Sequence, residues 1–68
     1  MRVVGDPSRV DGVGVQLVVA CHGEISEARL GAAMRHLQEI YDIPETFAGY
    51  DKQKAGDEVH YQLNFREP

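Results

Sequence analysis

The clearest pattern of apolar and polar positions lies at the end of the chain. From Glu58 to Arg66 apolar residues occupy every odd position and polar residues every even one. A period of two predicts a β-strand with one buried side, formed by Val59, Tyr61, Leu63 and Phe65. Such strict alternation favours an antiparallel sheet with one open face over a sheet covered on both sides. On the open face we expect His60, Gln62, Asn64 and Arg66.

A second strand is predicted over Val13–Cys21, which is more apolar than the last one. Its odd-numbered positions are all apolar, whereas its other face carries small or polar residues apart from Val18. This composition favours an interior place in the sheet. The odd positions are Val13, Val15, Leu17, Val19 and Cys21.

A helix is predicted between these strands. Ser26 is a suitable N-cap, and Ile25 before it can pack on Leu30 as a hydrophobic staple. Pro44 disfavours helical geometry at the residue before it, so we expect the helix to end near Asp42. Apolar residues at spacings of three and four then form one stripe that faces the sheet. The stripe comprises Leu30, Ala33, Met34, Leu37, Ile40 and Tyr41.

The remaining segments complete a small α+β domain over residues 1–68. We expect a third strand over Thr46–Gln53, a turn over Lys54–Asp57, a short edge strand over Met1–Val4 and a loop over Gly5–Gly12. The order (β)-β-α-β-β predicts a two-layer sandwich, with one amphipathic helix packed on a three- to four-stranded, mainly antiparallel sheet. Its order resembles that of dodecin-like and other small α+β oligomers in topology alone, with no shared motif, and implies no ligand.

Inside the predicted helix, Gly31 costs roughly 1 kcal/mol relative to alanine. We interpret it as a place where the helix approaches the sheet closely.

Composition limits what so short a chain can do. A chain of 68 residues buries only about 60% of its unfolded surface, and a single cysteine excludes an internal disulfide. We therefore expect self-association, most simply a homodimer.

The net charge of −4 and the scattered basic residues argue against direct nucleic-acid binding. The longest apolar run is too short to span a membrane, and a free thiol without a signal peptide predicts a cytoplasmic location.

The adjacent Cys21 and His22 raise the question of a nucleophile with its base. If the strand runs through both, their side chains point to opposite faces and cannot exchange a proton. We interpret Cys21 as a core residue at a strand end and expect no catalytic residues. His22, His36 and His60 lack the spacing of a metal site, and we expect neither a metal nor another cofactor.

Acidic residues gather where the predicted helix ends. Glu39 and Asp42 lie in the last turn and Glu45 just beyond, and no lysine or arginine occurs between Arg35 and Lys52. Acids at this end oppose the helix dipole. Such a group is either a solvated surface or a patch that docks on a basic partner.

These observations favour a non-catalytic protein-interaction module acting as an adaptor, regulator or stoichiometric inhibitor. We expect it to bind a larger, basic partner, such as a nucleic-acid-handling complex, through the acidic patch and the polar sheet face. One alternative is a small-molecule-binding homo-oligomer. A less favoured alternative is an enzyme that uses Cys21 with His22 or His60.

Overall fold

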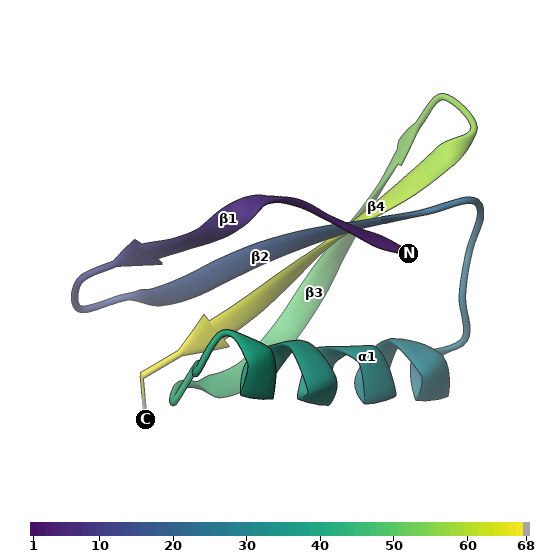
Figure 1. The fold of residues 1–68 in the computed structure, drawn as a ribbon. Coiled ribbons are helices and arrows are strands. Elements are labelled where there is room, and N and C mark those ends of the chain that lie inside the picture. Colours follow the sequence, from purple (N-terminus) through teal and green to yellow (C-terminus); the bar gives the residue numbers. More distant parts are fainter. Residues whose placement is uncertain (68) are drawn as a thin grey trace.

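A computed structural model describes residues 1–67 and shows one helix packed on a four-stranded antiparallel sheet (Figure 1). The strands lie in the order β1-β2-β4-β3. The predicted α+β class and element order are therefore confirmed. The elements are β1 (Arg2–Val10), β2 (Gly14–Cys21), α1 (Glu27–Ile40), β3 (Thr46–Ala55) and β4 (Glu58–Arg66).

The last strand lies in the middle of the sheet, between β2 and β3. Its register pairs Leu63 with Leu17 on one side and with Tyr50 on the other. Val59 and Phe65, at its two ends, are also buried. The alternation of β4 thus predicted its buried and open sides correctly, because a central strand with one covered face must follow a period of two.

The helix covers the buried side of the sheet. Ser26 caps it as predicted: its Oγ accepts a hydrogen bond from the backbone N–H of Arg29 at 3.2 Å. The Tyr61 hydroxyl accepts another from the backbone N–H of Ile25 at 3.1 Å, which fixes the entry to the helix against β4. Within residues 1–67, no helix is long and apolar enough to cross a membrane. The core consists of Val15, Leu17, Val19, Cys21, Leu30, Leu37, Ile43, Val59, Tyr61, Leu63 and Phe65.

The helix ends in a tight reversal that alters the predicted apolar stripe. The backbone N–H of Ile43 donates to the Gln38 carbonyl at 2.9 Å and that of Asp42 to the Glu39 carbonyl at 3.3 Å, the paired bonds of a Schellman motif. This reversal returns the Ile43 side chain to the core. The predicted apolar stripe was therefore wrong at its C-terminal end, where Ile40 is 57% exposed and Tyr41 is 36% exposed.

The first strand is longer than predicted. Gly5–Val10 is not a loop but continues β1 along β2, with an irregularity between Val4 and Ser8 that absorbs the turn-forming residues there. Pro7 can lie in it because β1 is an edge strand, whose outer backbone groups need no sheet partner. Three residues then turn into β2, which begins at Gly14. Val13 lies in that turn and is exposed rather than buried.

The hairpin between β3 and β4 is tighter than predicted. Ala55 pairs with Glu58, so only Gly56 and Asp57 form the loop. Gly56 has a φ of 66°, the positive value that the first central residue of a type II′ turn requires. β3 is therefore a ten-residue edge strand, with a bulge between Phe47 and Gly49.

Candidate functional site

The predicted polar residues of β4 lie on a sheet face that no other element of residues 1–67 covers (Figure 1). His60, Gln62 and Asn64 are half-buried, whereas Arg66 at the strand end is exposed. Because β4 is central, these four side chains form the middle of this surface rather than its margin. We call it the open sheet face.

The neighbouring strands add a small apolar patch to the open sheet face, beside the polar row of β4. The half-buried Val18 lies between Val4 of β1 and Gln62 of β4 in the sheet register. One row further along, Ala20 lies between Arg2 and His60 and is only 2% exposed, so it adds no accessible surface. The face therefore combines an apolar patch on β1 and β2 with polar and charged groups on β4, as protein interfaces commonly do.

A chain of hydrogen bonds holds the polar row in place. Gln62 Nε2 donates to Asn64 Oδ1 at 3.0 Å, and Asn64 Nδ2 donates to Asp51 Oδ2 of β3 at 3.2 Å. Sequence reasoning placed both amides on the open side of the strand but did not predict this connection. The bonds reduce the side-chain entropy that a partner would otherwise have to remove on binding.

Charged groups lie together at the end of the open sheet face near the β3–β4 turn. Arg2 Nη2 donates to Glu58 Oε1 at 2.8 Å, and His60 Nε2 lies 3.5 Å from the same oxygen. Desolvation would raise the pKa of Glu58, but the adjacent His60 and the positive charge of Arg2 outweigh it, and the pKa lies below its usual 4.5. The open sheet face thus carries both signs of charge.

The structure separates the three acids predicted at the helix end. Glu39 and Asp42 are exposed, but Glu45 is only 3% exposed. Its Oε2 forms an ion pair with Arg9 of β1, and its backbone carbonyl accepts a hydrogen bond from Gln38 Nε2 at 2.7 Å. Glu45 therefore does not belong to an exposed acidic patch. A pattern of charges along one segment could not reveal this, because the paired arginine lies 36 positions away.

Asp42 has a backbone role as well as a charge. Its φ of 50° places it in the left-handed region, at the position after the helix cap where glycine, asparagine and aspartate are tolerated. The unfavourable interaction of the Asp42 charge with the helix dipole is thus offset in part, because aspartate tolerates the left-handed backbone conformation at this position. The exposed acidic surface is reduced to Glu39 and Asp42, with the exposed Ile40 and Tyr41 between them in sequence.

The other chemistry-bearing residues are dispersed. Cys21 is 4% exposed in the core, whereas His22 is exposed in the following loop, as predicted for a structural junction. Among residues 1–67, no group of three or more histidine, cysteine, aspartate or glutamate side chains is arranged to hold a metal ion.

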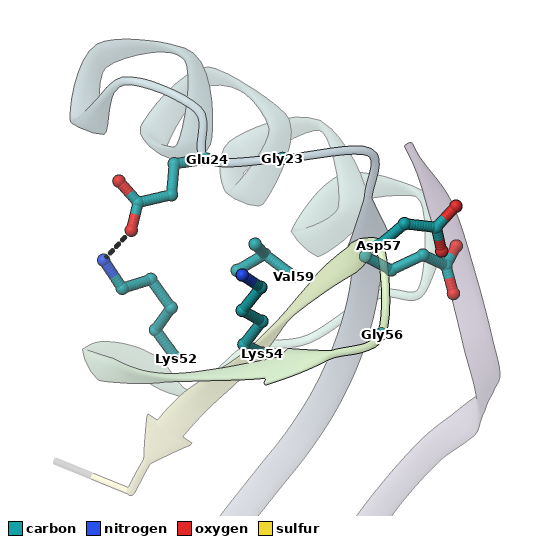
Figure 2. Close-up of a pocket in the computed structure, with 8 residues that line it drawn as sticks. Gly23, Glu24, Lys52, Lys54, Gly56, Asp57 and Val59 are labelled. Atoms are coloured by element: carbon teal, nitrogen blue, oxygen red, sulfur yellow. Dashed lines mark hydrogen bonds and ion pairs between the residues drawn. The ribbon is translucent and has the colours of Figure 1, made fainter.

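Sequence reasoning missed a hollow of about 460 Å³ beneath the loop that enters α1. Lys52 and Lys54 rise from β3 toward this loop, and Lys52 Nζ forms a 2.6 Å ion pair with Glu24 (Figure 2). The bond to Glu24 raises the pKa of Lys52, and the bond to Lys52 lowers the pKa of Glu24. Asp57 points away from both lysines (Figure 2). The bulge in β3 hides this site from sequence, since it moves even-numbered residues to the helix side.

In comparisons with protein-family models, curated proteins and solved structures, no match to this chain is found. A functional proposal therefore rests on the residues and their geometry alone.

Proposed function

We propose that this domain is a non-catalytic protein-interaction module that self-associates through the open sheet face. The observation that carries the proposal is an apolar patch on that face, formed by Val4 and Val18 beside the polar row of β4. A second copy is the occupant best matched to it. Positive Arg2 and Arg66 and negative Asp51 and Glu58 occur on the same face, so two identical faces can present opposite charges to each other.

The size of the domain supports the same proposal. So small a core leaves little margin of stability, and residues 1–67 contain only the single, buried cysteine, with no cluster arranged to hold a metal ion. Burying the open sheet face in a homodimer would supply additional apolar contact. The continuous antiparallel pairing of β2 with β4 over eight residue pairs gives this face a regular backbone.

Self-association would leave the end of the helix free for another protein. Glu39 and Asp42 carry negative charge there, and the exposed Ile40 and Tyr41 supply apolar contact. We infer that this surface docks on a basic partner, because complementary charge speeds association and sets orientation. Aromatic residues such as tyrosine are enriched at the centres of protein interfaces.

The self-association proposal is tested by substituting the apolar patch of the face. Val18→Arg places a charge in this patch and is expected to convert a dimer into a monomer in light scattering. The matched control is Ala32→Arg, which adds the same charge on the exposed side of α1 and should leave the mass unchanged. Equal masses for wild type and Val18→Arg would contradict the proposed interface.

The partner surface has a separate test. Glu39→Gln with Asp42→Asn removes both charges while keeping a residue that tolerates the left-handed backbone at position 42. We expect weaker capture of basic proteins at low salt and an unchanged dimer mass. Unaltered capture would exclude this surface without affecting the proposed dimer.

A further inference from the structure

The free edge of the sheet at β3 combines two chemistries on the side that faces α1. Phe47 and Tyr50 are apolar and contact the core, with ring centroids 5.7 Å from Phe65 and 5.8 Å from Tyr61. Beyond the bulge, Lys52 pairs with Tyr61 in the sheet register and therefore faces the same side. Lys54 follows two residues later. This side of β3 is thus apolar over its first half and basic over its second.

The apolar half borders a groove between β3 and α1 with a volume of about 320 Å³. Gly31 opens it from the helix side, because a β-carbon there would meet only the end of the Arg35 side chain at 3.9 Å. The interpretation of Gly31 as a point of close helix–sheet approach was therefore wrong. Its missing side chain instead leaves space over the buried Leu30, which lines the groove.

The basic half borders the larger hollow beneath the loop that enters α1, whose lining also includes Glu24, Asp57 and Glu58 (Figure 2). Lys52 already binds one carboxylate there, that of Glu24. This pair is exposed on both sides, so another carboxylate can exchange with it at small cost. Lys54 makes no ion pair within residues 1–67 and faces the same hollow (Figure 2).

We propose that β3 binds an extended acidic peptide by strand addition, independently of the open sheet face. The peptide pairs antiparallel with the free edge of β3 and places two acidic side chains opposite Lys54 and Lys52. An apolar side chain two residues further on fills the groove beside Tyr50. Alternate residues of a strand share one face, and four residues span about 13 Å, so one peptide reaches both hollows.

Charge complementarity selects this occupant. A second copy paired at the same edge would bring its own Lys52 and Lys54 to this side, and lysines on an edge strand disfavour such self-pairing. Glu27 lies at the rim of the groove and repels an acid there, which leaves that position to an apolar side chain. Read from the N-terminus of the peptide, the motif is therefore acid–x–acid–x–apolar, where x is any residue whose side chain faces away from α1.

The probe is a fluorescein-labelled, amidated peptide, Thr-Asp-Thr-Glu-Thr-Leu-Thr, titrated with the chain of 68 residues in fluorescence anisotropy at low salt. We expect saturable binding that weakens with added salt. A peptide with serine in place of leucine and one with lysines in place of both acids should each bind more weakly. Binding that is indifferent to both changes would overturn the proposed motif.

Two variants locate the site. Gly31→Leu fills the groove while improving helix propensity, and an unchanged circular dichroism spectrum and melting temperature separate a loss of binding from unfolding. Lys54→Glu should weaken binding about fivefold, because an attractive surface pair becomes a repulsive one. The control is Arg29→Glu, an equal change of net charge at an exposed position of α1 that lines neither hollow. Undiminished binding to Gly31→Leu, or equal losses for Lys54→Glu and Arg29→Glu, would refute the site.

Discussion

The ion pair between Arg9 and Glu45 gives the sharpest prediction about stability, because its two partners are buried to very different extents. The side chain of Arg9 is 49% exposed and that of Glu45 only 4%. Either removal breaks the same contact, which joins β1 to the segment between α1 and β3. We expect the two removals to have unequal costs, since Arg9 is already half hydrated in the folded domain whereas the Glu45 carboxylate is almost fully buried.

The magnitudes follow from that asymmetry. Arg9→Ala leaves a buried charge without a partner and should lower the free energy of unfolding by about 3 kcal/mol. Glu45→Gln removes the charge but keeps the shape, with an expected cost of about 1 kcal/mol. The free energy of unfolding of the whole domain is expected to be only about 3–10 kcal/mol, so Arg9→Ala brings the domain close to complete unfolding. The double variant Arg9→Ala with Glu45→Gln should be more stable than Arg9→Ala alone.

Urea unfolding followed by far-ultraviolet circular dichroism measures these differences. For so small a protein the free energy of unfolding falls by about 1 kcal/mol for each molar of urea. The urea concentration at the unfolding midpoint should therefore fall by about 3 M for Arg9→Ala and about 1 M for Glu45→Gln. An equal or larger shift for Glu45→Gln would refute the reasoning. So would a double variant that is less stable than Arg9→Ala.

Three further predictions concern the backbone and the charges. Gly14→Ala should prevent stable folding in thermal denaturation, because its β-carbon would overlap the backbone oxygen of Phe65; a stable variant would contradict the β2–β4 register. Gly31→Ala should raise the free energy of unfolding by about 1 kcal/mol, and a loss of stability would show that the space beside it is filled. Because the folded-state pKa of Glu58 is lowered, its contribution to the free energy of unfolding is present at neutral pH. That contribution is lost as the pH falls below about 4.5 and through the folded-state pKa. Arg2→Gln should reduce that loss in acid titrations of stability, and an identical acid profile would exclude the contribution of Arg2.

Local patterns predicted the parts of the fold that depend on local physics. The period of two in β4 and the spacing of Leu30 and Leu37 in α1 both follow from which face an element must bury. The N-cap at Ser26 was predictable for the same reason, because it satisfies backbone groups of its own helix.

The errors arose where distant parts of the chain override local signals. Gly5 and Pro7 favour a loop, yet pairing with β2 incorporates them into an edge strand at an irregular position. Glu45 belongs to an acidic segment, but Arg9 of β1 stabilises it in a buried place. The bulge between Phe47 and Gly49 reverses which residues of β3 face the helix. The alternation of residues in this segment therefore could not reveal the hollow that Lys52 and Lys54 line.

Sedimentation velocity of the wild-type protein over a dilution series tests the central claim most directly. If the open sheet face joins two copies, the sedimenting species should change from the mass of two chains to that of one as the protein is diluted, and unfolding should begin at lower temperature in the dilute samples. A one-chain species at every concentration, with an unfolding temperature independent of concentration, would contradict the account.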